Sequence, residues 1–128
     1  MILTDTSVVI DFVRTADRKL QQLIVAHAAT ICGVTRAEVL IGARNAAHRV
    51  RMLAVLQLFQ QLPIPDTLWG DIGDNLAALR RSGITVPFNN VVIATVAVSN
   101  GIELWTRDKQ FAMMQQILTP LQLFQEPP

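Results

Sequence analysis

Three acidic residues of this chain each accompany a short apolar run. Asp5 follows the apolar residues at the start of the chain, Asp108 follows a run that ends at Trp105, and Glu38 lies shortly after a second run. Acids placed just past buried strands can meet at one edge of a parallel sheet and hold a divalent metal ion there. Asn90 stands at a fourth such position, just before another apolar run, where a further acid would complete the cluster.

The chemistry of clustered carboxylates explains why a metal ion is expected. Two carboxylates about 4 Å apart repel by about 4 kcal/mol at an effective dielectric constant near 20. Several together are tolerated when a cation lies among them or when some are protonated. Mg²⁺ and Mn²⁺ prefer oxygen ligands, and a bound ion activates a water and stabilises charge on a phosphoryl group. The pattern suggests a metal-dependent nuclease with one ligand altered.

Each acid also has a purely structural explanation. Asp5 and Asp108 could each cap the helix that follows, and Glu38 lies three residues after Thr35, which is the spacing of a capping box. The caps are three separate coincidences, whereas a metal site explains all three acids at once. Zinc is disfavoured because the single cysteine and the two histidines show no ligand spacing.

Short apolar strands separated by helical patterns must position these residues. We expect strands at residues 2–4, 29–32 and 102–105, an edge strand at 118–124, and helices at 7–13, 17–28, 35–43, 46–60, 66–83 and 108–116. Residues 87–99 are rich in Val and Ala, and their length and the following Asn100-Gly101 favour a helix that is buried on most sides. The alternation indicates an α/β fold with a short parallel sheet flanked by helices.

Apolar spacing also predicts which helix faces are buried. The expected core residues are Val9, Ile10 and Val13 in the first helix, and Val50, Leu53, Ala54 and Leu58 in the fourth.

The fourth helix carries more apolar surface than one face can bury, because Met52, Val55, Leu56 and Phe59 are apolar as well. We therefore expect a homodimer. Analytical ultracentrifugation that finds only monomer at micromolar concentration would contradict this prediction.

Composition and charge narrow the class of protein. The 128 residues suggest one domain, residues 1–128, and a hydrophobic content of 51% with 16% charged residues argues against disorder. No apolar run is long enough to span a membrane, no signal peptide is visible, and the lone Cys32 suits a reducing cytoplasm. The net charge of +1 does not indicate a nucleic-acid partner. Clustered basic residues could contact phosphates, although solvated helix faces are the simpler explanation on charge alone.

The ordered segments resemble PIN-domain proteins, in particular the VapC-type toxin ribonucleases of bacterial toxin–antitoxin pairs. The resemblance rests on residues 1–11, 34–42, 90–97 and 106–108, and it spans nearly the whole chain. It implies a three-layer PIN fold and an endoribonuclease whose acids hold Mg²⁺ or Mn²⁺. It also implies a homodimer and a cognate antitoxin that blocks the site.

The resemblance assigns roles position by position. Asp5, Glu38 and Asp108 match the family's acids, and Asn90 stands where the family usually has its third acid. Thr6 and Thr106 match polar residues that line the site, and Gln110 stands where many members carry a further acid. Separately from the resemblance, the candidates for contact with the RNA backbone are Arg44, Arg80, Arg81 and Lys109.

Asn90 keeps the shape of an acid and removes its charge. Its carbonyl oxygen is a weaker metal ligand than a carboxylate, and its amide NH₂ would donate to a neighbouring carboxylate. We expect a folded protein with weakened metal binding and impaired RNA cleavage. The substitution is either deliberate, because an active toxin arrests the cell that makes it, or natural, and the otherwise intact acids favour a deliberate change.

Two other functions fit parts of the pattern. One is a non-catalytic RNA- or protein-binding module of PIN fold, which the Asn90→Asp variant distinguishes from an enzyme. The other is a receiver-like signalling domain, whose acids also hold Mg²⁺. A receiver needs a suitable lysine well after its phosphoacceptor, whereas Lys109 immediately follows Asp108.

Overall fold

Four short strands form one parallel sheet in the computed structural model, which describes residues 1–128. The sheet has the order β3-β2-β1-β4, and its strands are β1 (Ile2–Thr4), β2 (Ala29–Cys32), β3 (Gln60–Leu62) and β4 (Leu104–Trp105). In register, Ile2 of β1 pairs with Ala29 of β2, and Leu3 pairs with Leu104 of β4. The predicted α/β fold with a short parallel sheet is confirmed.

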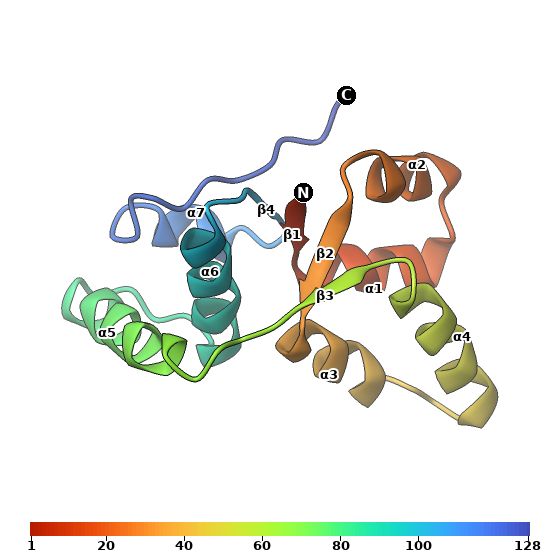
Figure 1. Ribbon diagram of the computed structural model, residues 1–128, viewed down its shortest axis with the longest axis horizontal. Coiled ribbons are helices and arrows are strands. Elements are labelled where there is room, and N and C mark those ends of the chain that lie inside the picture. The colour runs from red at the N-terminus through yellow and green to blue at the C-terminus, as the bar shows by residue number, and fades with distance from the viewer.

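Seven helices cover the two faces of this sheet (Figure 1). They are α1 (Thr6–Thr15), α2 (Arg18–Ala26), α3 (Gly33–Ile41), α4 (Ala46–Leu56), α5 (Leu68–Arg81), α6 (Phe88–Asn100) and α7 (Gln110–Met114). Helices α1 to α4 lie on one side of the strands and α5 to α7 on the other, which is the predicted three-layer arrangement. No helix is long and apolar enough to cross a membrane.

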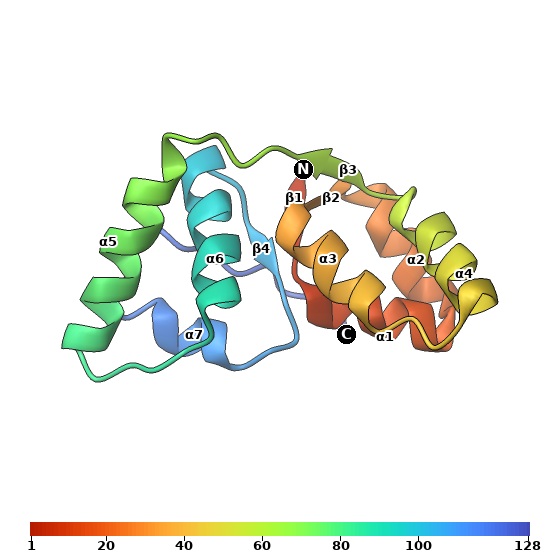
Figure 2. The ribbon, with the colours of Figure 1, turned by 90° about the horizontal axis from the view of Figure 1, so that it is seen from below.

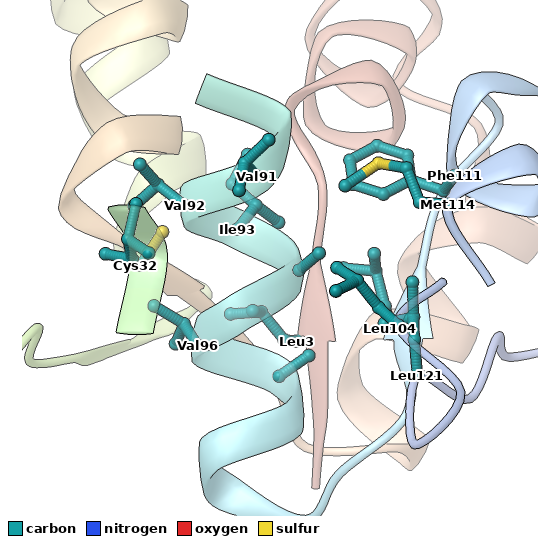
Figure 3. Packing of buried hydrophobic residues seen from close by; sticks show 14 of the residues in the cluster. Leu3, Cys32, Val91, Val92, Ile93, Val96, Leu104, Phe111, Met114 and Leu121 are labelled. Carbon is teal, nitrogen blue, oxygen red and sulfur yellow. The ribbon is translucent and has the colours of Figure 1, made fainter. Parts of the chain in front are cut away.

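The alternation of side chains along each strand produces two separate cores. Ile2 belongs to the core under α1 to α4, while the next residue, Leu3, belongs to the core under α5 to α7. The same alternation separates Ile31 from Cys32 in β2, and it separates Leu104 from Trp105 in β4. Figure 3 shows the second core, in which residues of α6 and α7 surround the strands. Both faces of the sheet are therefore buried, as a parallel sheet requires.

Helix α6 is buried almost all round. Every residue from Asn90 to Ala97 is at most 9% exposed, so the apolar run needs no polar face. The helix ends at Gly101, whose φ of 63° is the left-handed conformation that stops helices and favours glycine. The predicted buried helix is confirmed, and Asn90 lies in its first turn.

The predicted buried faces of two helices are partly wrong. In α1, Val8, Val9 and Phe12 are buried, while Ile10 is 44% exposed. In α4, the buried residues are Met52 and Leu56, while Val50 and Ala54 are exposed. Leu58, which lies just past the end of α4, is exposed as well. Both helices carry apolar residues on more than one side, so spacing alone does not determine which side meets the sheet. Met52 and Leu56, which were expected to be additional apolar surface of this helix, are therefore the residues through which α4 contacts the core.

Several predicted element boundaries also differ from the structure. Helix α4 ends at Leu56 because the chain from Gln60 joins the edge of the sheet as β3. Helix α7 begins at Gln110 instead of Asp108, and the expected strand at 118–124 is reduced to a single parallel bridge between Leu104 and Leu123.

The predicted capping box at Thr35 is absent. Helix α3 begins at Gly33, with Cys32 as its N-cap residue, so Thr35 lies inside the helix, where it is fully buried. The helix starts early because strand β2 passes into it without an intervening loop. The structural explanation for Glu38 is therefore removed.

The strand order reverses at β1. From β1 the chain builds β2 and then β3 on one side, and it later returns to place β4 on the other side. In open α/β sheets such a reversal leaves a crevice outside the carboxyl ends of the strands, where ligands bind. Asp5 follows β1, and the segment from Thr106 to Asp108 follows β4, so both lie at the carboxyl ends of the strands beside this reversal, and we call this part of the molecule the crevice.

Candidate active site

Asp5 is the most buried acid of the crevice, with only 3% of its surface exposed. Its Oδ2 accepts hydrogen bonds from the hydroxyls of Ser7 (2.7 Å) and Thr106 (2.8 Å) and a longer one from the backbone N–H of Ser7 (3.4 Å). Asp5 is thus the N-cap of α1, as its position suggested. No side chain donates to its other oxygen, Oδ1, so the side-chain contacts account for only one oxygen of this carboxylate.

The charge of Asp5 is not compensated by any basic side chain. Burial raises the pKa of this carboxyl group, and the hydrogen bonds from Ser7 and Thr106 lower it only in part. The ion pairs of the protein involve Asp11 and Glu126, and none involves Asp5, Glu38 or Asp108. A cation bound in the crevice would supply the missing compensation.

Glu38 reaches the crevice from α3. Its Oε1 accepts a hydrogen bond of 2.8 Å from the hydroxyl of Thr6, which also lies 3.3 Å from the hydroxyl of Thr35. Thr6 is the residue after Asp5, so this contact ties α3 to the start of α1. Glu38 is therefore held next to the Asp5–Thr6 peptide.

Asn90 and Asp108 are in direct contact. The amide nitrogen of Asn90 donates to Asp108 Oδ2 at 3.3 Å and to Gln110 Oε1 at 3.0 Å. Asp108 Oδ1 accepts from the backbone N–H of Gln110 at 2.9 Å, so one of its oxygens caps the first turn of α7. The expected donation from the Asn90 amide to a neighbouring carboxylate is present, and it leaves the Asn90 carbonyl as the free oxygen of this side chain.

The hydroxyl of Thr106 joins the two halves of the site. It donates to Asp5 Oδ2 at 2.8 Å and accepts from the backbone N–H of Asp108 at 2.9 Å. One set of hydrogen bonds thus runs from Asp5 through Thr106 to Asp108 and Asn90. A second joins Thr6 to Glu38, and the two sets meet at the Asp5–Thr6 peptide. The site predicted from the sequence thus corresponds to two sets of hydrogen bonds that share this peptide.

The donor atoms suit a hard divalent cation. No three histidine, cysteine or carboxylate side chains lie close enough together to hold a metal ion by themselves. The oxygens directed to the crevice belong to carboxylates and to one amide, which is the ligand type that Mg²⁺ and Mn²⁺ accept, with waters filling the remaining positions. The oxygen atoms of these residues are therefore of the type that such an ion binds. Because Asn90 is neutral, the four side chains carry one negative charge fewer than four acids would.

Ser7 has a larger part in the site than its sequence position indicated. Its hydroxyl donates to Asp5 Oδ2 and accepts from the backbone N–H of Arg107 at 3.1 Å. Ser7 was not among the site residues predicted from the sequence. Its place two residues after a buried acid was the available signal.

The four candidate RNA contacts lie in different places. Arg44 lines a groove of about 350 Å³ together with Glu38, and Lys109 lines a hollow of about 360 Å³ together with Asp108. Arg80 and Arg81 are exposed in the last turn of α5 and line neither space. Figure 2 shows this end of α5 on the same side of the molecule as the first turn of α6, where Asn90 lies.

Comparison with known proteins identifies relatives of this fold. A family model described as the PIN domain matches residues 2–116. The structure is similar to that of VapBC2 from Rickettsia felis bound to a DNA fragment from their promoter, with a TM-score of 0.84, 16% identity, and coverage of 97% of this chain and 98% of that one. It is also similar to DNA-bound VapBC from Salmonella typhimurium, with a TM-score of 0.80, 20% identity, and coverage of 97% and 98%.

A third similar structure is a toxin–antitoxin complex from Klebsiella pneumoniae. Its TM-score is 0.68 at 26% identity, and the alignment covers 96% of this chain and 100% of that one. No curated protein sequence matches the chain. The likeness therefore rests on the family model and on shared architecture over nearly the full length.

Proposed function

The chain belongs to the PIN-domain family, and from this premise we propose that it is a Mg²⁺- or Mn²⁺-dependent endoribonuclease toxin of a toxin–antitoxin pair. The observation that carries the proposal is the crevice at the reversal of strand order. There a buried, unpaired carboxylate on Asp5 is linked through Thr106 to Asp108. A structural carboxylate of this burial would be expected to have a basic partner, and Asp5 has none.

Each residue of the crevice has a proposed role. Asp5, Glu38, Asp108 and the carbonyl of Asn90 hold the cation, which when bound supplies an activated water and stabilises negative charge on the scissile phosphate. Thr106 orients Asp5 through its hydroxyl, and Thr6 orients Glu38. The hydroxyls of Ser7 and Thr106 both donate to Asp5 Oδ2, so no hydroxyl group donates to Oδ1.

Asn90 weakens this site in two ways. It removes one negative charge, and its NH₂ group occupies Asp108 Oδ2, one of the oxygens that a cation needs. This hydrogen bond would compete with a cation for the negative charge of that oxygen. We propose that cleavage by this chain is impaired for that reason.

The proposed substrate is RNA held through its backbone. Phosphate contacts position a strand without reading its sequence. The chain has no tyrosine, five phenylalanines and two tryptophans, which provide little material for stacking bases. Recognition by the shape of the RNA follows from this composition.

Arg44→Gln is expected to weaken RNA binding, because Arg44 lines the groove beside Glu38 and has no ion-pair partner. Losing one phosphate contact should lower affinity by about three- to tenfold and reduce its salt dependence by about one charge. Fluorescence anisotropy with a labelled single-stranded RNA at several salt concentrations measures both. Arg18→Gln, which changes an exposed arginine outside this groove, is the matched control, and equal effects of the two variants would argue against a specific role for Arg44.

The proposed protein partners are a cognate antitoxin and a second copy of this chain. The three similar structures described above are VapBC2, VapBC and a toxin–antitoxin complex. We propose that an antitoxin encoded beside this chain blocks the crevice. Failure of the two products to copurify would count against that partner.

A non-catalytic binding module remains the second candidate, and one observation favours it. Asn90 donates hydrogen bonds to Asp108 and Gln110, and the backbone of Gln110 donates to Asp108, so these three residues are linked to one another without a metal ion. Two matched amides also favour a natural origin of Asn90 over a deliberate one, against the sequence-based expectation. The Asn90→Asp experiment described in the Discussion separates the two candidates.

A further inference from the structure

The last residues of the chain are built into the structure next to the site. Gln122 accepts a hydrogen bond of 2.8 Å from the backbone N–H of Leu104, and Phe124 donates one of 2.8 Å to the carbonyl of the same residue. We call residues 122–128 the C-terminal segment. Figure 1 shows the chain leaving α7 and passing β4 before it ends.

Side chains anchor this segment along its length. The ring of Phe124 packs edge-on against Trp105 at 5.3 Å and against His27 at 4.7 Å. Lys19 donates from Nζ to the carbonyl oxygen of Pro128 at 2.9 Å. The segment is therefore held against β4 and the helices at its far side.

Glu126 in this segment binds Arg107 through a two-pronged ion pair. Arg107 donates from Nε to Oε2 at 2.9 Å and from an Nη to Oε1 at 2.8 Å, while its other Nη donates to Asp11 at 2.9 Å. Paired contacts between a guanidinium and a carboxylate are among the stronger and more directional hydrogen bonds in proteins. Arg107 lowers the pKa of Glu126. This effect is the main cause of the lowered pKa of Glu126.

Arg107 lies inside the site. It stands between Thr106 and Asp108, and its backbone N–H donates to the Ser7 hydroxyl that in turn donates to Asp5. The hollow beside Asp108 has one wall formed by Thr106 to Lys109 and another formed by residues 123–126. The C-terminal segment is thus one wall of a hollow that Asp108 also lines.

The ion pair also holds the positively charged guanidinium of Arg107 in a defined position. Its guanidinium pairs with Asp11 and Glu126 and makes no ion pair with Asp5 or Asp108, although it belongs to the same loop. Without Glu126, the uncompensated carboxylates of the crevice would attract this nearby cation. A guanidinium among them would take the place that a divalent ion needs.

We propose that Glu126 is a positioning residue of the site: it fixes the loop from Thr106 to Asp108 and holds the Arg107 guanidinium away from the carboxylates. The inference rests on the proposed function for its consequence in catalysis. Its structural part, the ordering of the loop, does not depend on that function.

Glu126→Gln tests both parts, because it removes the charge and leaves a side chain of the same size. In the unmodified chain, amide hydrogen exchange at Arg107 and Asp108 should become about tenfold faster, the loss expected for one charge-assisted contact. In the Asn90→Asp background, kcat for RNA cleavage should fall about tenfold with little change in KM. Glu126→Asp, which keeps the charge, should change the exchange rates and kcat less than Glu126→Gln does. Glu103→Gln, at the opposite end of β4, is the control.

The outcomes separate this inference from the proposed function. Unchanged exchange at Arg107 and Asp108 would overturn the positioning role. Faster exchange with unchanged kcat would overturn its link to catalysis. If Asn90→Asp itself cuts no RNA, the proposed function fails, and the exchange rates alone then decide whether Glu126 fixes the loop.

Discussion

Asn90→Asp is expected to turn this chain into an efficient RNA-cleaving enzyme that requires Mg²⁺ or Mn²⁺. The change restores a charged oxygen ligand and removes the NH₂ group that occupies Asp108 Oδ2. The loss of one preorganised electrostatic contact commonly costs about 100- to 1000-fold in kcat, so a gain of about 100-fold is the expected scale. Cleavage of total cellular RNA in the presence of Mg²⁺ or EDTA measures it, and mapped cleavage sites would identify the target.

The neighbouring residue provides the control for this variant. Asn89→Asp adds the same charge at an exposed position one residue away and should leave cleavage unchanged. Asn90→Asp should also lower the melting temperature in EDTA, because the new carboxylate faces Asp108, and Mn²⁺ should restore it. If Asn90→Asp gives neither metal-dependent cleavage nor growth arrest on expression, the enzyme proposal fails and the binding module is favoured.

Asp5→Asn is expected to abolish cleavage in the Asn90→Asp background, by about 1000-fold, while making the metal-free protein more stable at neutral pH. The amide can still accept the hydrogen bonds from Ser7 and Thr106 that Oδ2 accepts now. The substitution removes a buried, unpaired negative charge. A cation needs this charge for binding, and the charge must lose its water when the protein folds. The loss in rate follows from the loss of a ligand for the ion.

The pH dependence of this stability follows from the direction of the pKa shift. The pKa of Asp5 is raised in the folded protein from an ordinary value of 3.8, so the folded state binds its proton more tightly than the unfolded state. The free energy of unfolding therefore decreases as pH rises from 3.8 through the folded pKa, and the penalty is complete above it. Asp5→Asn should remove this decrease.

Thermal unfolding in EDTA across the pH range tests the prediction, with Asp66→Asn, which changes an exposed acid, as the control. A variant that still cuts RNA would show that Asp5 is no ligand. If Asp5→Asn has a lower metal-free melting temperature at pH 7 than the unmodified chain, the Asp5 carboxylate stabilises the fold. The explanation of its burial as a metal ligand would then be wrong.

Much of the site was predictable because it depends on local sequence. An apolar run followed directly by an acid predicted both β1 and the place of Asp5 at its end. The all-apolar stretch after Asn90 predicted a buried helix, since a helix of this length without a polar face must be surrounded. The donation from the Asn90 amide to a carboxylate followed from the chemistry of the amide group alone.

What escaped prediction depends on contacts between distant segments. The Thr35–Glu38 spacing suggested a capping box, but β2 runs directly into α3, and Glu38 instead pairs with Thr6, 32 residues away. Strand β3 begins with two exposed glutamines at the sheet edge, so it carries little of the apolar signal of a strand. The Arg107–Glu126 ion pair joins the loop after β4 to the C-terminal segment, 19 residues further along the chain.

The central claim is that the crevice carboxylates bind a divalent cation and that Asn90 weakens this binding. Calorimetric titration with Mn²⁺, comparing the unmodified chain with the Asn90→Asp variant, tests it most directly. One restored charge near the ion predicts an affinity at least about tenfold higher in the variant, and Asp5→Asn should remove the binding heat from both. Equal Mn²⁺ affinity of the unmodified chain and the Asn90→Asp variant would contradict the account.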